Sequence, residues 1–441
     1  MIVWQSAAQD GSSNGIFAQR YDANGTIVGS ELQVNSTELG AQVESSVIGL
    51  SAGRFVVTWT DQNGLDGSGQ GVFGQIFDAN GLLVGAEFQV NSEFSSTQNN
   101  SEIAALNDGG FVVTWVSQTS SSAGDGSGLG IFAQRYDDSG SAQGSEFLVN
   151  TQTSSSQFQS STSGLSDGGF VIVWTSVDSG SAGDGSSSGI FGQRYDATGT
   201  AIAGGEFLVN TDTLNAEEDP VVAGLSGGGF VVAWRADSGQ DGSGSGIFAQ
   251  RYDINGVEVD GEFRVNSTTI NSQSDPAITA LDNGGFVVTW TDNSGQIDPS
   301  GGVFGQQYDA LGNRVDDQFQ VNTATSSTQD QSTVAGLSSG NFVVAYRSFA
   351  DAFSDQDSAV YHQLFGDPAD FASALNTPVL EGINAEITYS ETAVNTQPQL
   401  LDANQAVVLS DVDSASLDGG SVLVARVNNT ESLLEQFNTP D

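Results

Sequence analysis

The sequence predicts an all-β fold: a seven-bladed β-propeller of four-stranded antiparallel blades, followed by part of a second β-domain. One unit of about 57 residues recurs seven times over residues 1–376. Within each unit, short runs of Val, Ile, Phe, Tyr and Trp alternate with Gly-containing turns, and 56 of the 441 residues are Gly. No stretch carries a long apolar stripe at helical spacing, so helices are not expected.

Three residue positions mark the repeat, and each of them recurs seven times along the chain. The first is an aromatic residue that ends a β-branched run, at Trp4, Trp59, Trp115, Trp174, Trp234, Trp290 and Tyr346. The second is a Gln in runs such as Ile-Phe-Ala-Gln-Arg-Tyr-Asp, at Gln19, Gln75, Gln134, Gln193, Gln250, Gln306 and Gln363. The third is an Asn that follows Val or Leu, at Asn35, Asn91, Asn150, Asn210, Asn266, Asn322 and Asn376.

Each unit is expected to contain four strands, which in the third unit are residues 103–106, 111–115, 131–136 and 146–149. An Asp-Gly-Gly turn separates the first two strands, and an Asp-x-x-Gly turn separates the last two, with the Asp capping the turn. Tight turns require antiparallel hairpins, which disfavours an open β-solenoid. Identity between successive four-strand sets favours a propeller over a sandwich.

The first unit lacks a predicted first strand, because Met1 falls inside the second strand of that unit. Either an upstream strand has been cut away, or a later segment at 385–389 completes the ring and leaves no open sheet edge. We favour truncation. After residue 376 the repeat stops, and residues 377–441 are expected to form a linker and an incomplete β-module.

The charge and the rare residue types exclude several functions. The chain has 54 acidic residues, ten basic residues and a net charge of −44, which repels nucleic acid and anionic membranes. It has no Cys and one His, so disulfides, thiol catalysis and His-clustered metal sites are excluded, and a Ser-His-Asp triad is not expected. No apolar run of about 18 residues is present, so membrane insertion is not expected.

Candidate calcium ligands are the acidic residues of the loop between the second and third strands of each unit. Calcium prefers hard oxygen ligands, which a carboxylate, a Ser hydroxyl and loop carbonyls supply. The alternative is that Asp-Gly only forms the turn. These candidates are Asp10, Asp66, Asp125, Asp184, Asp241, Asp298 and Asp355. In the tail, Asp411 and Asp413, with Asp418 nearby, are candidates at a module junction, or an acidic loop.

The repeat Gln shares a strand face with two aromatic residues, as Phe17, Gln19 and Tyr21 do. A buried Gln must be hydrogen-bonded, and we expect it to bond to the backbone of the neighbouring blade. The Trp series is expected to form the blade core, as in the run that ends at Trp59. The alternatives are a sugar-binding Gln and exposed, lectin-like Trp residues.

The segment 241–290 reads Asp-Gly-Ser-Gly-x-Gly-Ile-Phe-Ala-Gln-Arg-Tyr-Asp, then Glu-Phe-x-Val-Asn, then Gly-Gly-Phe-Val-Val-x-Trp. It resembles repeats of very large secreted bacterial proteins, the RTX-type (hemolysin-type calcium-binding) adhesins and exoproteins. The resemblance covers about residues 1–376, and residues 378–427 resemble the start of a cadherin-like, Ig-type module. The resemblance implies a secreted or cell-surface protein exported by type I secretion, with a monomeric propeller inside a longer chain.

These observations predict a non-catalytic recognition or spacer module, calcium-stabilised and related to adhesion, with a glycan or cell-surface ligand. The chain is not expected to be an enzyme, because no singular polar residue breaks the repeat. Glu217, Glu218 and Asp219 are interpreted as a solvated connection. A lectin-like propeller and a polysaccharide-active enzyme are the alternatives. A ligand is expected at the end of the ring where the variable Asp-Gly-Ser loops emerge.

Overall fold

The computed structural model describes residues 1–366 apart from 8, 23–24, 68, 93–96, 119–127, 154, 178–186, 214, 238, 297, 326 and 350–357. Beyond residue 366 it describes four strands, at 379–381, 408–410, 421–428 and 431–438. The chain divides into two compact units, Met1–Gly366 and Asp367–Asp441. Among the described residues, no helix has the length and hydrophobicity needed to span a membrane.

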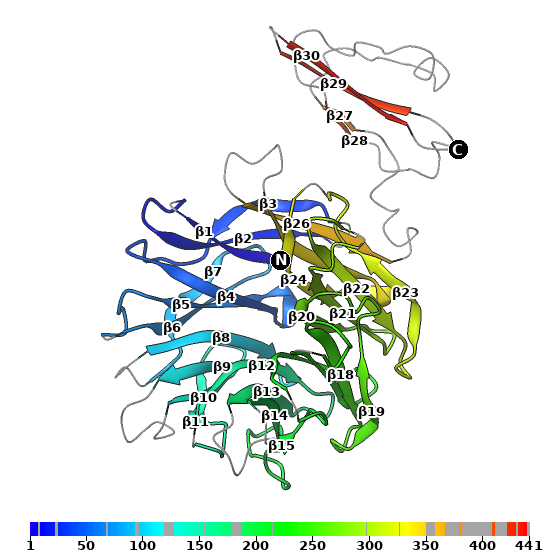
Figure 1. The fold of residues 1–441 in the computed structure, drawn as a ribbon. Helices are drawn as coiled ribbons and strands as arrows, with labels where there is room; N and C mark the ends of the chain where they lie inside the picture. The colour runs from blue at the N-terminus through cyan, green and yellow to red at the C-terminus, as the bar shows by residue number, and fades with distance from the viewer. Residues whose placement is uncertain are drawn as a thin grey trace. The chain divides into compact units, whose positions relative to one another are not determined.

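The first unit is a ring of seven antiparallel sheets, which confirms the predicted seven-bladed propeller (Figure 1). Blade 1 has three described strands, β1 (Ile2–Ala7), β2 (Asn14–Tyr21) and β3 (Ile27–Gln33). Blade 2 comprises β4 (Gln42–Gly49), β5 (Phe55–Asp61), β6 (Gly71–Phe77) and β7 (Leu83–Gln89). Blade 3 comprises β8 (Thr97–Ala105), β9 (Phe111–Gln118), β10 (Leu129–Tyr136) and β11 (Ala142–Leu148).

The remaining blades repeat this order from the innermost to the outermost strand. Blade 4 comprises β12 (Gln157–Gly164), β13 (Phe170–Val177), β14 (Ser188–Tyr195) and β15 (Phe207–Leu208). Blade 5 comprises β16 (Glu217–Gly224), β17 (Phe230–Ala236), β18 (Gly246–Tyr252) and β19 (Glu258–Arg264). Blade 6 comprises β20 (Gln273–Ala280), β21 (Phe286–Asp292), β22 (Gly302–Tyr308) and β23 (Arg314–Gln320). Blade 7 has three described strands, β24 (Gln329–Gly336), β25 (Phe342–Phe349) and β26 (Ser358–Phe365).

The Asp-x-x-Gly turns cap the hairpins between the third and fourth strands, as predicted. In blade 5, Asp253 Oδ1 accepts hydrogen bonds from the backbone N–H of Asn255 at 2.8 Å and of Val257 at 2.9 Å. The bond from Val257 is the main reason why the pKa of the Asp253 carboxyl is lowered. The turn at Gly256 has φ of +79°, a conformation that suits glycine.

The repeat Gln forms hydrogen bonds to two strands of its own blade. The prediction that it bonds to the backbone of the neighbouring blade is therefore wrong. In blade 5, Gln250 Nε2 donates to the backbone carbonyl of Arg251 at 2.8 Å and to that of Val259 at 3.2 Å. The pairing of β18 with β19 shifts register at this residue. The side-chain amide therefore bonds to carbonyls on both sides of the β-bulge.

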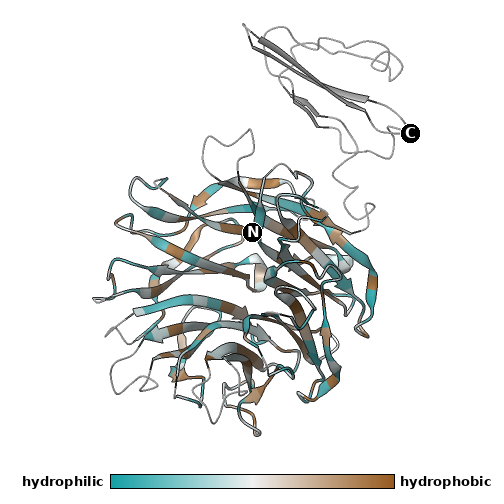
Figure 2. Ribbon diagram, viewed as in Figure 1, coloured by the Kyte–Doolittle hydropathy of each residue, from teal (hydrophilic) through white to brown (hydrophobic). Residues whose placement is uncertain are grey.

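Apolar side chains pack between successive blades. Figure 2 shows that hydrophobic residues recur along the strands of the ring. Among the described residues, six clusters join the blades in pairs, from blades 1 and 2 through blades 6 and 7. The repeat aromatic residues Trp59, Trp115, Trp174, Trp234, Trp290 and Tyr346 are buried in them. The prediction that the Trp series forms the core is confirmed for these positions, whereas Trp4 is only partly buried.

The junction between blade 7 and blade 1 differs from the other six, and we call it the seam. Among the described residues, no apolar cluster joins these two blades. The rings of Tyr21 and His362 meet across the seam, with centroids 4.7 Å apart. The ring of blades is therefore closed by weaker packing at this one junction.

In the second unit, β27 (Val379–Glu381) pairs with β28 (Val408–Ser410), and β29 (Ser421–Asn428) pairs with β30 (Glu431–Asn438). Both pairs are antiparallel. The segment 385–389, proposed above as a ring-closing strand, lies outside the described residues. The cadherin-like character of this unit stays a prediction.

Candidate functional site

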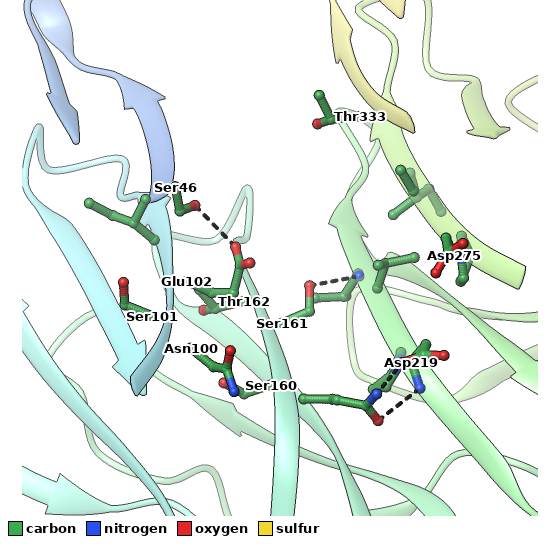
Figure 3. A pocket seen from close by; sticks show the side chains of 18 of the residues that line it. Ser46, Asn100, Ser101, Glu102, Ser160, Ser161, Thr162, Asp219, Asp275 and Thr333 are labelled. Carbon is green, nitrogen blue, oxygen red and sulfur yellow. Dashed lines mark hydrogen bonds between the residues drawn. The ribbon is translucent and has the colours of Figure 1, made fainter. Parts of the chain in front are cut away.

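The innermost strands of blades 2–7 line a central channel with a cavity of about 940 Å³ (Figure 3). These strands are β4, β8, β12, β16, β20 and β24. Each begins after the connection from the previous blade, so all six start at the same end of the ring. The loops between second and third strands emerge at that end, which is where a ligand was expected.

Each innermost strand has a β-bulge two residues after a Gln, or after Glu217 in blade 5, that pairs at or next to the start of the strand. At the bulge a residue other than Gly adopts φ of +50° to +56°, an uncommon conformation for such residues. All six bulge residues carry polar side chains and line the channel: Glu44, Asn100, Gln159, Asp219, Asp275 and Gln331. The bulges therefore place a partial ring of carboxylates and amides at one end of the channel.

The Glu44 carboxylate links blade 2 to blade 3. Its Oε2 accepts a hydrogen bond from Thr60 Oγ1 at 2.8 Å and another from the backbone N–H of Asn100 at 2.9 Å. Both donors hold the carboxylate in one orientation beside the next bulge. The side chain is itself exposed to the channel.

Gln159 and Asp219 form the corresponding link between blades 4 and 5. Gln159 Oε1 accepts from Thr175 Oγ1 at 3.0 Å and from the backbone N–H of Asp219 at 3.2 Å, and Gln159 Nε2 donates to Asp219 Oδ1. Arg235 Nε lies 3.0 Å from Asp219 Oδ2. Burial raises the pKa of Asp219, and the Arg235 guanidinium opposes this shift.

Glu102 is a carboxylate on the channel wall that departs from the repeat. Its counterparts in the other innermost strands are Ser46, Ser161, Val221, Ala277 and Thr333. The Ser46 hydroxyl donates to Glu102 Oε2 at 3.1 Å (Figure 3). Glu102 is exposed to the channel. Desolvation by the surrounding channel walls raises the pKa of its carboxyl to about 7, and the hydrogen bond from Ser46 opposes this shift.

The channel lining suits a ligand rich in hydroxyl groups. Its polar atoms are carboxylates, amides and the hydroxyls of Ser and Thr, which accept and donate hydrogen bonds. No aromatic side chain belongs to the described lining, so recognition here depends on hydrogen bonds and not on stacking. The carboxylates and the net charge of −44 disfavour anionic ligands.

The interpretation of Glu217, Glu218 and Asp219 as a solvated connection is wrong. They form the start of β16, the innermost strand of blade 5. Glu217 takes the place of the Gln that begins this strand in other blades, and it accepts a hydrogen bond from Asn210 Nδ2 at 3.2 Å. Glu218 forms an ion pair with Arg235. The seven-residue step from the repeat Asn to this position was the signal that could have revealed a strand.

Four of the predicted calcium ligands are described, Asp10, Asp66, Asp241 and Asp298, and each lies in the loop of a different blade. Asp66, Asp241 and Asp298 each accept a hydrogen bond from the Nδ2 group of the repeat Asn in their own blade. Among the described residues, no three acidic or His side chains form a group that could hold a metal. Asp125, Asp184, Asp355, Asp411 and Asp413 lie outside the described residues.

Asp10 differs from the other described loop carboxylates. Its Oδ1 accepts the backbone N–H of Ser12 at 3.0 Å, and its Oδ2 is buried and lacks a hydrogen-bond partner among the described residues. A buried carboxylate oxygen of this kind is available to a cation. Asp10 is therefore the loop position that best fits the calcium prediction.

No family model and no curated protein matches this chain. Solved structures with a similar fold include an α-L-arabinanase from Penicillium chrysogenum bound to arabinobiose, with 12% identity, a TM-score of 0.49, and coverage of 73% of this chain and 93% of that one. The NanB sialidase from Streptococcus pneumoniae has 10% identity, a TM-score of 0.47 and coverage of 76% and 70%. A protein of unknown function from Dyadobacter fermentans has 11% identity, a TM-score of 0.47 and coverage of 73% and 94%.

The prediction that the chain is not an enzyme is corrected, because its premise does not hold on the channel wall. That prediction depended on the absence of polar residues that break the repeat. Glu102 breaks it on the channel wall, and Asp219 is paired there with Arg235.

Proposed function

We propose that the central channel binds a carbohydrate. The observation that carries the proposal is the partial ring of bulge residues, in which each of six blades directs a carboxylate or amide into one cavity. Such groups bond to sugar hydroxyls, and the hydrogen bonds that orient Glu44 and Gln159 fix their positions before a ligand arrives. The acidic lining favours neutral over anionic sugars.

Hydrolysis of a glycosidic bond is a second candidate, and Glu102 favours it. Glycoside hydrolases use one protonated carboxyl as general acid and a second carboxylate as base or nucleophile. With its pKa raised to about 7, Glu102 holds a proton near neutral pH. Glu44 would provide the second carboxylate, since it bonds to the backbone of Asn100, two residues from Glu102.

A glycan array and a polysaccharide hydrolase screen on the full chain test both candidates. We expect at least one neutral glycan to bind, and Glu102→Ala to weaken that binding about tenfold, equivalent to one lost hydrogen bond of about 1.4 kcal/mol. Glu258→Ala is the matched control, because Glu258 is exposed on the outermost strand β19. Absence of binding and of turnover across both screens would contradict the proposal.

The setting that we propose is a secreted or cell-surface bacterial exoprotein, in which glycan binding would serve adhesion. The resemblance of residues 241–290 to RTX-type repeats supports this setting. The composition is compatible with it, because a chain with no Cys does not depend on disulfides outside the cell.

We also propose calcium binding at the Asp-Gly-Ser loops, supported by the buried oxygen of Asp10. Millimolar calcium added to metal-stripped protein should raise the Tm, because a cation that binds only the folded state stabilises it. Asp10→Asn should reduce this rise. Unchanged Tm and no heat of binding in a calorimetric titration would refute calcium binding.

A further inference from the structure

Among the described residues, no strand pairs with the inner edge of blade 1. In blades 2–7 the second strand pairs with an innermost strand, whereas the equivalent strand in blade 1, β1, pairs only with β2 among the described residues. A cavity of about 690 Å³ lies along the seam, between β1 and the strands of blade 7. We call this cavity the seam slot. Its lining shares Glu44, Ser45, Gln331 and Thr333 with the central channel, so the two cavities adjoin.

Apolar side chains that are buried elsewhere in the ring are exposed in the seam slot. Val360 is 46% exposed. Its counterparts in the other six blades, Ile16, Val72, Ile131, Ile190, Ile247 and Val303, are 0% exposed. Trp4 lines the slot from the other side and is only partly buried, in contrast to Trp59 at 1%. Among the described residues, the two blades thus present apolar side chains that belong to no common apolar cluster.

Gln5 on β1 lacks, among the described residues, the innermost-strand partner that the equivalent residues have in blades 2 and 4. At the corresponding position in blade 2, Thr60 holds the bulge side chain of its own innermost strand, Glu44. In blade 4, Thr175 holds Gln159 in the same way. Gln5 has no innermost strand to hold among the described residues, and its Oε1 instead accepts the backbone N–H of Glu44 in blade 2 at 3.4 Å.

We propose that the seam slot is a binding site for an extended peptide strand of the same type as the six innermost strands. A strand of this type has Gln or Glu at its first position, a residue with positive φ at its third position and Gly or Ala at its last position. Its sixth position is apolar in several blades, as at Ile103, Val222 and Val334. The strand pairs antiparallel with the inner edge of β1, completes blade 1 and supplies the seventh bulge residue of the channel. The occupant that we propose is a separate peptide strand of this type, because the seven-residue step from Asn376 reaches Ile383, which is neither the Gln nor the Glu with which the repeat starts an innermost strand.

The register follows from blade 6, where Gln273 lies opposite Asp292 and Ile278 lies opposite Val288. Trp290 and Trp4 are equivalent, so the first residue of the added strand lies opposite Ser6 and the sixth opposite Ile2. In blade 7 the sixth residue, Val334, packs in the cluster shared with blade 6, which includes Val303. The sixth residue of the added strand therefore packs toward Val360, the counterpart of Val303.

The test is to extend the full chain before Met1 with a copy of residues 273–286, which contain the innermost strand and turn of blade 6. This copy joins Met1 in the register derived above. We expect a higher Tm and weaker acrylamide quenching of Trp4, assigned by comparison with Trp4→Phe. The matched control carries aspartate in the copy at the position of Ile278, and it should give neither effect, because a carboxylate cannot pack against Val360.

A second measurement does not depend on the fused chain. The synthetic peptide with the sequence of residues 273–286 should bind the unmodified chain, protect Trp4 from quenching and raise the Tm, and Val360→Asp should abolish these effects. If the extension and the peptide both leave the Tm and Trp4 quenching unchanged, the proposal is wrong. The outcome is independent of glycan binding, because the readouts are Trp4 and Tm in the absence of any sugar.

Discussion

Replacing Asn266 with alanine should lower the free energy of unfolding by about 3–5 kcal/mol, because several buried polar groups lose their partners at once. Asn266 is 0% exposed, and its Oδ1 accepts the backbone N–H of Ile247 at 2.8 Å. Its Nδ2 donates to the Thr268 carbonyl at 2.7 Å and to Gln273 Oε1 at 2.9 Å, and Asp241 Oδ2 lies 3.3 Å from the same nitrogen. The residue thus joins blade 5 to the innermost strand of blade 6.

Urea denaturation measures this loss. The control is Asn255→Ala, because Asn255 is exposed in a turn of the same blade and its backbone N–H bond to Asp253 survives the substitution. We expect the control to change stability by less than about 1 kcal/mol. Equal effects of the two substitutions would mean that the repeat Asn does not hold the blades together.

Replacing Glu102 with glutamine should lower the rate of any turnover that the wild-type chain shows by about 100-fold or more. The reason is that a glutamine side chain cannot donate a catalytic proton. Wild-type turnover should decline as the pH rises through about 7, where Glu102 loses its proton. Rates measured against pH on the substrate found in the screen test both statements. Retained activity in Glu102→Gln would remove Glu102 from the mechanism.

The same substitution has a consequence for stability that needs no substrate. The pKa of Glu102 is about 7 in the folded state and 4.5 for an ordinary Glu, so the folded state binds the proton more tightly. Stability from this group is therefore fully present below pH 4.5 and is lost as the pH rises toward 7. Relative to the wild type, Glu102→Gln should gain Tm between pH 4.5 and pH 7. A difference in Tm that does not vary with pH would contradict the raised pKa.

The blades were predictable from the sequence because their signals are local. The Trp and Gln series and the turn residues each lie inside one hairpin, and hairpin chemistry determines the strands around them. The innermost strands were predicted too short: residues 103–106 were expected, and β8 extends over Thr97–Ala105. Its first half contains Asn99 and Asn100, a polar pair without alternating hydrophobicity, because that half carries the bulge.

The channel was not predictable for a related reason. The bulge position is occupied by Glu, Asn, Gln or Asp, as at Glu44, Asn100, Gln159 and Asp219. No single residue type therefore marks this position in the repeat. What these residues share is a backbone conformation and a place on the ring. Glu102 was overlooked because a single acidic residue in a chain with 54 of them has no local signature. Its raised pKa depends on walls supplied by other blades.

The seam also determines how the propeller comes apart. With six apolar clusters among the described residues for seven blades, the ring is energetically a linear array bent into a circle. In such an array, stability is a sum of the units and their nearest-neighbour interfaces. Among the described residues, each interior blade shares an apolar cluster with both of its neighbours, and blades 1 and 7 each share a cluster with only one neighbour. Fraying therefore starts at both ends of the array, and a strand bound along β1 would convert two free ends into one continuous cooperative unit.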